Sequence, residues 1–459
     1  MKILILGAGQ VGVSIAEVLV GEDNDVTIVD LNQDTLRLLQ DRLDIRTVSG
    51  SAALPSVLRN AGAEDASLVL AVTNSDEVNL VACQIADNVF STPTKIARLR
   101  SKEYLNNNEL FVGDSGFQVD VVISPEQIVR DHIARLIEFP GASQVLDFAD
   151  GLVQLVGVKA VNGGALIGHP LRELKKHMAD VETRVAAIYR SGEVIIPMSE
   201  TVIQESDEVF FVAARQHIRD VMREMRGKSD KTKRIFIAGG GNIGLNLALE
   251  LERKGYSVKL IEHNPERADL IAERVESTIV LNGDAADAGL LLQENIENCD
   301  VFCAVTERDE INILSAKLAK QLGAKRVQAL VNKVAYVENL VHLDINAIIS
   351  PRTATIGSVL AHIRRGDVVA VHSLRRGRAE AIEAIAHGDE SSSKVIGKGV
   401  RDIPFARGTG VGAIVRNEKV IIPNAETVIQ AEDHVIIFID DKASIADVEA
   451  LFQVDVTFL

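Results

Sequence analysis

The chain opens with the stretch Lys2-Ile-Leu-Ile-Leu-Gly7-Ala8-Gly9-Gln10-Val11-Gly12, and its pattern returns halfway along as Arg234-Ile-Phe-Ile-Ala-Gly239-Gly240-Gly241-Asn242-Ile243-Gly244. Each stretch begins as an apolar, β-branched run that is typical of a buried strand. It continues as G-x-G-x-x-G and leads into a helical pattern. A second apolar run follows and ends in a carboxylate, Asp30 in the first copy and Glu262 in the second. This order of strand, glycines, helix and acid predicts a dinucleotide-binding domain in each half of the chain.

The three glycines of each copy have separate physical roles. The first allows a tight turn from strand to helix, the second lets the backbone approach a phosphate, and the third lets the helix pack close to the strand. Free N–H groups and the helix dipole then attract an anion. Asp30 and Glu262 can accept hydrogen bonds from a ribose hydroxyl and would repel a 2′-phosphate, so NADP is disfavoured. The alternative is a nucleotide-binding fold whose pocket stays empty.

Composition limits the classes of function. With 459 residues the chain should hold several domains, and its net charge of −16 argues against a nucleic-acid partner. The cysteines Cys83, Cys299 and Cys303 are too few for a disulfide framework and suit a reducing cytoplasm. Cys299 and Cys303 have no second pair of ligands, so we expect core packing and no metal site. No apolar run has the length of a membrane span and no signal peptide is apparent, so we expect a cytoplasmic protein.

The first half alternates apolar runs with helical patterns such as 10–20 and 33–42. Alternation of this kind predicts a parallel sheet with helices on both faces. The expected strands are 2–6, 25–30, 46–49, 68–71, 95–98 and 119–123. From about Gly141 the pattern changes to short strands at 152–158, 185–189, 193–196 and 208–213 around one helix at 171–177. This predicts a small α+β unit, which ends in a charged linker.

The second half repeats the first. Ala71-Val-Thr73 recurs as Ala304-Val-Thr306, and Val194-Ile-Ile-Pro197 recurs as Val420-Ile-Ile-Pro423. We therefore predict an α/β fold with two Rossmann-like, doubly wound parallel-sheet domains, each followed by a small α+β domain. The expected domains are 1–140 and 141–226, a linker at 227–233, and then 234–366 and 367–459.

A helix is expected at 127–138, introduced by Ser124-Pro125-Glu126. Its apolar residues form one stripe. Because the helix follows the last strand, this stripe can pack on a second subunit or a neighbouring domain, or it can close the core of its own domain. The pattern alone leaves these interpretations open.

Over its whole length the chain resembles the RCK/KTN family of regulators of potassium conductance. The glycine loops, Asp30 and Glu262, the repeated Ala-Val-Thr strand ends and the Val-Ile-Ile-Pro segments carry the resemblance. It implies a regulatory protein without catalysis, which binds NAD(H) or ATP/ADP. It also implies a ring, typically a homotetramer of tandem chains, beneath an integral membrane potassium transporter or channel. The chain would thus be peripheral to the inner face of the membrane.

The resemblance also implies site residues. The first site would contain Gly7, Ala8, Gly9, Gln10, Val11, Gly12, Asp30, Thr73, Asn74 and Arg98. The second would contain Gly239, Gly240, Gly241, Asn242, Ile243, Gly244, Glu262, Thr306, Glu307 and Val331. One departure is that Ser51 stands in the first copy where the family pattern, and the second copy at Asp284, has an aspartate.

The two sites differ in charge. The first copy has Ala97-Arg98-Leu99-Arg100 where the second has Ala329-Leu330-Val331-Asn332. Strand C-termini face the ligand crevice in doubly wound sheets, so Arg98 and Arg100 can meet terminal phosphates. We expect the first site to sense phosphate number or charge, and the second to bind a less charged nucleotide or to be structural. The alternative is that both arginines form surface salt bridges.

Two other classes remain as alternatives. An NAD-dependent oxidoreductase needs a proton-transfer group near the nicotinamide, but the ten histidines are scattered and none has a catalytic context, so we expect no catalytic residues. A transcription regulator needs a basic surface, and the short cluster Arg375-Arg-Gly-Arg378 is better explained as a solvated turn.

Overall fold

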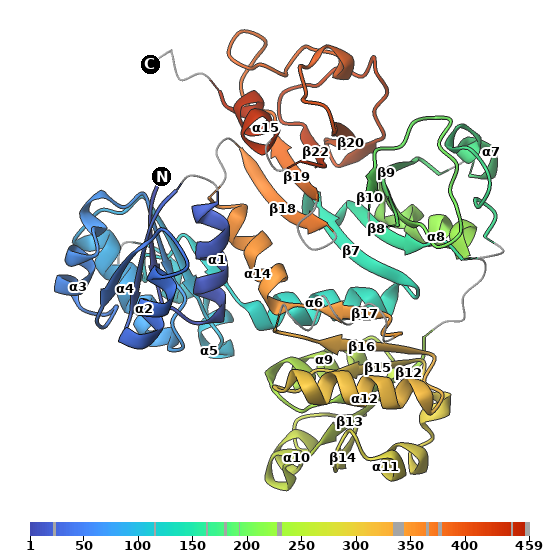
Figure 1. Cartoon of the computed structure of the whole chain (residues 1–459), viewed down its shortest axis with the longest axis horizontal. Helices are drawn as coiled ribbons and strands as arrows, with labels where there is room; N and C mark the ends of the chain where they lie inside the picture. Colours follow the sequence, from blue (N-terminus) through green and yellow to red (C-terminus); the bar gives the residue numbers. More distant parts are fainter. Residues whose placement is uncertain are drawn as a thin grey trace. The chain divides into compact units, whose positions relative to one another are not determined.

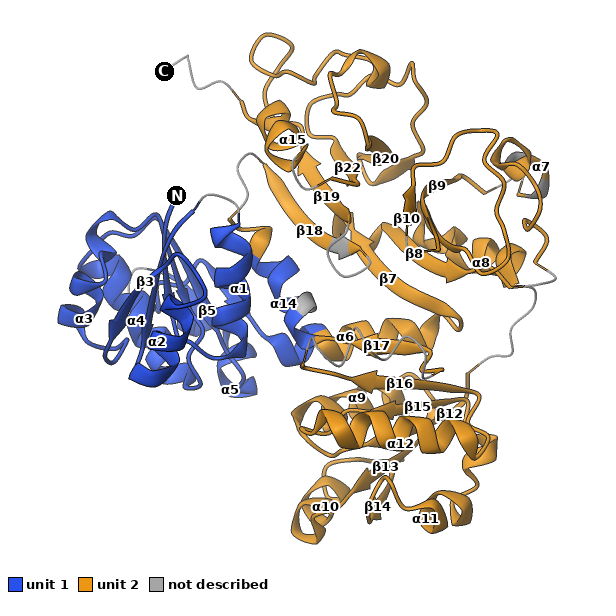
Figure 2. Cartoon of the chain, viewed as in Figure 1, with its two compact units in different colours: residues 1–128, 351–359 blue, residues 129–350, 360–459 orange. Residues whose placement is uncertain are grey.

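The structure, a computed structural model, describes residues 1–21, 24–113, 116–161, 164–178, 181–191, 193–226, 232–333, 344–363, 367–374, 379–441 and 444–454. Most of the expected linker 227–233 and the basic cluster 375–378 lie outside the described residues. The described chain forms four sheets, two parallel and two antiparallel (Figure 1). By compactness the chain divides into two units, residues 1–128 with 351–359 and residues 129–350 with 360–459 (Figure 2).

The first parallel sheet has the strand order β3-β2-β1-β4-β5-β6. Its strands are β1 (Lys2–Leu6), β2 (Asp25–Asp30), β3 (Arg46–Ser49), β4 (Leu68–Ala71), β5 (Thr94–Arg98) and β6 (Val121–Ile123). Its helices are α1 (Gln10–Val20), α2 (Gln33–Gln40), α3 (Pro55–Asn60), α4 (Asp76–Asn88) and α5 (Lys102–Leu105). The order reverses between β1 and β4, which makes the carboxyl ends of these strands the switch point where such sheets bind ligands.

The second parallel sheet repeats this order as β14-β13-β12-β15-β16-β17. Its strands are β12 (Arg234–Ala238), β13 (Ser257–Glu262), β14 (Ile279–Asn282), β15 (Val301–Ala304), β16 (Arg326–Leu330) and β17 (Ala347–Ile349). The helices are α9 (Asn242–Arg253), α10 (Pro265–Ala272), α11 (Ala288–Gln293) and α12 (Asp309–Gln321). Equivalent strands pair in the same register, since Leu6 faces Val29 and Ala238 faces Ile261. The predicted fold class is therefore confirmed.

The two antiparallel sheets share one topology as well. The first, in the order β10-β9-β11-β8-β7, contains β7 (Ala142–Phe148), β8 (Val153–Lys159), β9 (Thr183–Arg190), β10 (Glu193–Ile195) and β11 (Glu208–Ala214). The second, in the order β18-β19-β22-β20-β21, contains β18 (Val368–Leu374), β19 (Ala379–Ile385), β20 (Thr409–Arg416), β21 (Lys419–Ile421) and β22 (His434–Ile439). Buried residues of both sheets, such as Phe210 and Phe438, belong to one apolar core.

The prediction of a single helix in the first small domain was wrong. Besides α7 (Leu174–His177), the domain has α8 (Ile218–Arg226), and the second small domain has α15 (Ile445–Phe452). Helix α8 buries Ile218, Val221, Met222 and Met225, which recur at helical spacing and face the core.

Helix α6 (Pro125–Glu138) follows the last strand of the first parallel sheet along the chain, but it packs on the second parallel sheet. Its buried residues Val129, Ile133 and Ile137 share a core with Leu247 and Leu251 of α9. Of the interpretations that the sequence left open, packing on a neighbouring domain is therefore the one observed. The equivalent helix of the second copy, α14 (Pro351–Leu360), belongs from Pro351 to Val359 to the compact unit of the first sheet (Figure 2).

Candidate nucleotide-binding sites

The first glycine loop has the geometry of a phosphate cradle. Gly7 follows β1 with φ +113°, a conformation that side chains rarely adopt, and its N–H donates to the carbonyl oxygen of Val29 at 2.8 Å. A Cβ on Gly12 would collide with the carbonyl oxygen of Gly7, whereas a Cβ on Gly9 would meet nothing within 4 Å. Gly9 is the N-cap residue of α1, and as a glycine it has no side chain that could bind the N–H groups at the helix start. The loop therefore leaves the start of α1 open to an anion.

The second glycine loop has the same geometry. Gly239 has φ +107°, and its N–H donates to Ile261 at 2.9 Å. A Cβ on Gly244 would collide with Gly239, while Gly241 faces open space and caps α9 with no side-chain hydrogen bond. Gln10 and Val11 begin α1 as Asn242 and Ile243 begin α9, so their backbone N–H groups lie at the two helix starts.

The carboxylates at the ends of β2 and β13 hold the glycine loops from the neighbouring strand. Asp30 accepts the N–H of Ala8 at 2.6 Å, and Glu262 accepts the N–H of Gly240 at 2.9 Å. A Cβ on Gly240 would lie 2.9 Å from Oε2 of Glu262. The longer side chain of Glu262 thus contacts Gly240, and the shorter side chain of Asp30 contacts Ala8. In each copy, the size of the loop residue therefore suits the length of the acidic side chain.

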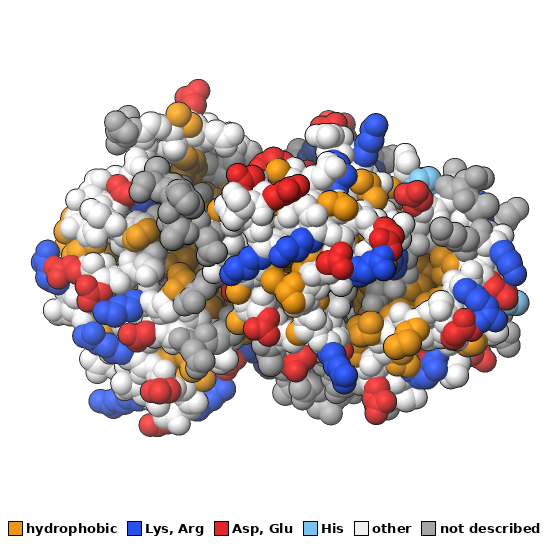
Figure 3. All heavy atoms as spheres, turned by 90° about the horizontal axis from the view of Figure 1, so that it is seen from above, with side chains coloured by type: hydrophobic (Ala, Val, Ile, Leu, Met, Phe, Trp, Pro, Cys, Tyr) orange, Lys and Arg blue, Asp and Glu red, His pale blue; other side chains and the backbone are white. Residues whose placement is uncertain are grey.

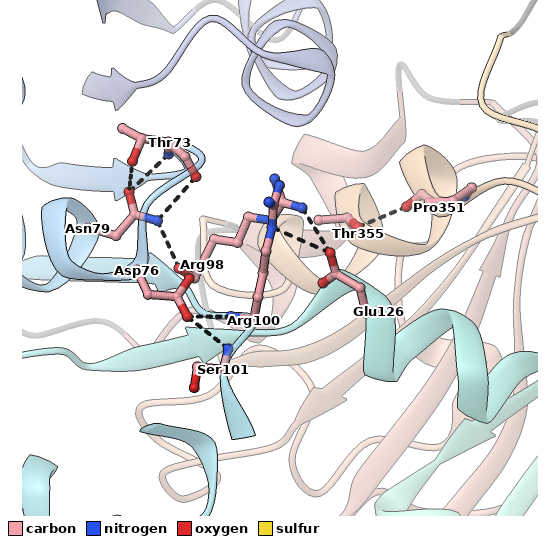
Figure 4. Close-up of polar contacts among 9 residues, drawn as sticks. All are labelled: Thr73, Asp76, Asn79, Arg98, Arg100, Ser101, Glu126, Pro351 and Thr355. Atoms are coloured by element: carbon pink, nitrogen blue, oxygen red, sulfur yellow. Dashed lines mark hydrogen bonds and ion pairs between the residues drawn. The ribbon is translucent and has the colours of Figure 1, made fainter. Parts of the chain in front are cut away.

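Two buried asparagines that were not among the predicted site residues each clamp two strand ends together. Asn79 of α4 accepts hydrogen bonds from the N–H (2.9 Å) and hydroxyl (2.7 Å) of Thr73, and it donates to the carbonyl oxygens of Thr73 (3.3 Å) and Arg98 (2.8 Å) (Figure 4). Asn312 makes the same four contacts with Thr306 and Leu330. The repeat of Asp-Glu-x-Asn in both copies was the signal for this clamp.

An aspartate at the start of the same helix holds the segment that follows the next strand. Asp76 accepts the backbone N–H groups of Arg100 at 2.9 Å and Ser101 at 2.8 Å (Figure 4). Asp309 does the same for Asn332 and Lys333. The neighbouring residues Asn74 and Glu307 are exposed in the loops after β4 and β15. The backbone of Arg98 to Ser101 is thus fixed by α4.

Arg98 and Arg100 converge on one carboxylate, Glu126, in the first turn of α6 (Figure 4). Glu126 Oε1 lies 3.1 Å from Arg98 Nη2 and 3.5 Å from Arg100 Nε. Both arginines therefore form ion pairs, but the Arg98 side chain is only 13% exposed, whereas that of Arg100 is 39% exposed. Burial lowers the pKa of the Arg98 guanidinium below its ordinary value, and the Glu126 charge opposes that shift.

The second copy has no such cluster. The clamp identifies Leu330 as the counterpart of Arg98, so Val331 corresponds to Leu99, and both Val331 and Leu99 are fully buried. Arg352 stands where the first copy has Glu126, and it pairs instead with Glu17 of α1. Val331, which was predicted in the second site, therefore lies in the core, and its N–H donates to the carbonyl oxygen of Ile349.

The loop that departs from the family pattern is built alike in both copies. Asp284 Oδ1 accepts the N–H of Ala286 at 2.9 Å, and the hydroxyl of Ser51 accepts the N–H of Ala53 at 3.4 Å. In the second copy, the Asp284 carboxylate thus stabilises a local turn. In the first copy, the Ser51 hydroxyl accepts the equivalent hydrogen bond.

The described residues include no group of three or more His, Cys, Asp or Glu that could hold a metal ion. All three cysteines are buried, and burial raises the pKa of the Cys83 and Cys299 thiols to about 12. Such thiols stay protonated and unreactive near neutral pH.

Within the described part of the chain, no helix is both long and apolar enough to cross a membrane. On the face drawn in Figure 3, acidic and basic side chains are interspersed among apolar ones.

Comparison with known families agrees with this architecture. The TrkA-N domain matches residues 3–125 and 235–351, and the TrkA-C domain matches residues 155–226 and 390–453. Solved structures share the fold. The chain superposes on "Crystal Structure of the GsuK RCK domain" with TM-score 0.62 and 19% identity, covering 95% of this chain and 92% of that one. On "GsuK channel bound to NAD" the values are 0.62 and 18%, with coverage of 98% and 79%.

The class of this protein is defined by its tandem of TrkA-N and TrkA-C domains. Two relatives are each named Trk system potassium uptake protein TrkA. The one from Halomonas elongata is 56% identical and the one from Vibrio alginolyticus 54% identical, both over 100% of either chain. The chain belongs to this TrkA family. The names of these relatives describe a part of potassium uptake and not an enzyme, which agrees with the expectation of no catalysis.

Proposed function

We propose that this chain is the peripheral regulatory subunit of a potassium-uptake system and gates an integral membrane partner of the TrkH/TrkG type. Full-length relatives at 56% and 54% identity carry the name of a Trk system potassium uptake protein. The chain would act from the cytoplasmic face of the membrane, where it is held by its partner.

The signal that the subunit reads is proposed to be a nucleotide, NAD(H) or ATP/ADP. The observation that carries this proposal is the paired geometry of the two glycine loops, which leave Gly9 and Gly241 open at two uncapped helix starts. Asp30 and Glu262 stand beside these loops to accept ribose hydroxyls. The first site, with Arg98 and Arg100, suits the more highly charged ligand.

Regulation then requires two shapes of the assembly with different affinities for the ligand. We propose a homotetrameric ring in which nucleotide binding orders the glycine loops and strand ends. A coupling of about 1–3 kcal/mol per site is typical of allosteric proteins and amounts to a factor of roughly 5–150. Several sites on one ring would add up to a usable switch.

The test is calorimetry on the full chain with NAD, NADH, ATP and ADP, using Gly9→Val and Gly241→Val to block one site at a time. Each variant should lose one class of binding site. In cells that lack the native subunit, the Gly9→Val chain should accumulate to the level of the native chain. It should not restore nucleotide-dependent potassium uptake. Failure of the unmodified chain to bind any of the four nucleotides would refute the proposed function.

A further inference from the structure

Glu126 has no equivalent in the second copy, where Arg352 stands at its position. It lies in the first turn of α6, and one of its oxygens faces both Arg98 and Arg100 of the first site (Figure 4). Residues 1–128 belong to one compact unit, so this contact is internal to it.

The cluster is only partly satisfied. Within the described residues, Oε2 of Glu126 and Nε of Arg98 are buried and have no hydrogen-bond partner. Each guanidinium offers a fork of donors that a carboxylate or a phosphate can fill with two parallel hydrogen bonds. Here one oxygen of Glu126 pairs with both arginines. The remaining guanidinium N–H donors are therefore available to an anion of higher charge, such as a phosphate.

The other carboxylate near these arginines has a different task. Asp76 accepts the backbone N–H groups of Arg100 and Ser101, which positions the main chain and leaves the guanidinium groups to Glu126. The second copy carries Leu330, Asn332 and Arg352 at the three positions of the cluster. The cations and the carboxylate are therefore absent together, as expected if they act together.

We propose, on the basis of the nucleotide-binding function above, that Glu126 is an internal competitor for the terminal phosphate of the ligand and sets the preference of the first site for phosphate number. A ligand whose terminal phosphate reaches Arg98 and Arg100 displaces the carboxylate. A ligand with one phosphate fewer leaves the contact in place.

Displacement of Glu126 changes the first turn of α6. The N–H groups of Gln127 and Ile128 both bind the carbonyl oxygen of Ser124, the residue before the helix, so the turn that carries Glu126 is anchored on that residue. From Val129 onward the same helix belongs to the second compact unit, where its apolar stripe is part of the core. Release of the carboxylate thus acts on a helix that continues into the second unit.

The test compares Glu126→Gln with the native chain by calorimetry with ATP and with ADP, in EDTA so that no metal bridges the two anions. The variant keeps the shape of the side chain and removes its charge. We expect ATP to bind about fivefold more tightly or better, with ADP affinity unchanged. Glu64→Gln, which removes one charge from the exposed Arg59–Glu64 pair, is the matched control and should change neither affinity.

Unchanged or weaker ATP binding by Glu126→Gln would overturn the competition, while the proposed nucleotide function would stand because the native chain still binds. Absence of binding by every variant and by the native chain would refute both. A second readout is amide hydrogen exchange at residues 126–128 of the native chain. Exchange there should rise with ATP and not with ADP, and equal protection with both ligands would also overturn the proposal.

Discussion

Arg130 of α6 forms an ion pair with Glu250 of α9, with 3.2 Å between Nε and Oε2. Arg130 belongs to the first copy of the repeat and Glu250 to the glycine-loop helix of the second. The apolar stripe of α6 is buried in a core that includes residues of the second parallel-sheet domain. The two halves of the chain are therefore joined by shared core and not only by a linker.

Truncating a side chain of the apolar stripe of α6 should destabilise the second half of the chain. Ile133 is fully buried, so Ile133→Ala should lower the free energy of unfolding by about 2–5 kcal/mol, through lost burial and a cavity. Urea unfolding followed by circular dichroism measures this loss. Leu270→Ala on α10 is the control, because Leu270 is 56% exposed and its loss should cost little. Equal, small effects of both changes would argue against the shared core.

The glycines of the first loop should respond differently to substitution. Gly9→Val adds a side chain into open space, so the chain should stay folded while phosphate access is blocked. Gly12→Ala forces a Cβ against the carbonyl oxygen of Gly7, so it should lower thermal stability even without a ligand. Thermal unfolding and calorimetry with ATP separate the two effects. A Gly9→Val chain that binds ATP normally would show that the loop is not the phosphate cradle.

Two histidines should make stability depend on pH. His132 of α6 and His372 of β18 neighbour the ion pair between Arg135 and Asp147, which is 2.6 Å long. Burial lowers the pKa of each imidazole from 6.5 to about 4, with Arg135 adding to the effect. The unfolded chain therefore binds more protons than the folded chain between these values. Stability should be full above pH 6.5 and fall toward pH 4, by roughly 2 kcal/mol per histidine.

Urea unfolding at several pH values from 7.5 to 4.5 tests this dependence. His132→Asn should flatten the profile, because one of the two protons is then no longer taken up on unfolding. His169→Asn is the control, since His169 lies exposed beside Glu173. A profile that His132→Asn leaves as steep as before would show that this histidine is not held neutral in the fold.

The sequence predicted the parallel sheets well because most of their strands are compact apolar runs, of which β1 and β12 lead into a glycine and β2 and β13 end in a carboxylate. Strand β7 was missed. Its register shifts between Ala142 and Gln144, which breaks the alternation that identifies a half-buried strand. Helix α8 was missed although its apolar spacing is regular. This spacing was sufficient to predict the helix, so the error was one of interpretation.

The site residues divide in a similar way. The glycine loops and acids are local patterns, so sequence alone placed them together. The contacts of Asn79 with Arg98 and of Glu126 with Arg98 span 19 and 28 residues, and they exist only because α4 and α6 return to the end of β5. The correspondence of Arg98 with Leu330, which the sequence comparison of the two copies already gave, agrees with the equivalent hydrogen bonds of Asn79 and Asn312.

Arg98→Ala should separate ligands by phosphate number. The change removes the guanidinium, whose Nη2 lies 3.1 Å from Glu126, and keeps the main-chain carbonyl oxygen that accepts the hydrogen bond of Asn79. A charge-assisted hydrogen bond contributes about 1.5–3 kcal/mol, so ATP affinity should fall by roughly 10- to 150-fold. ADP affinity should fall much less, because in the proposed site its last phosphate would stop short of the arginine. Calorimetry on the full chain measures both, with Arg59→Ala as a control for loss of an exposed arginine from the same unit. Equal losses for ATP and ADP would mean that Arg98 supports the site as a whole and does not read the terminal phosphate.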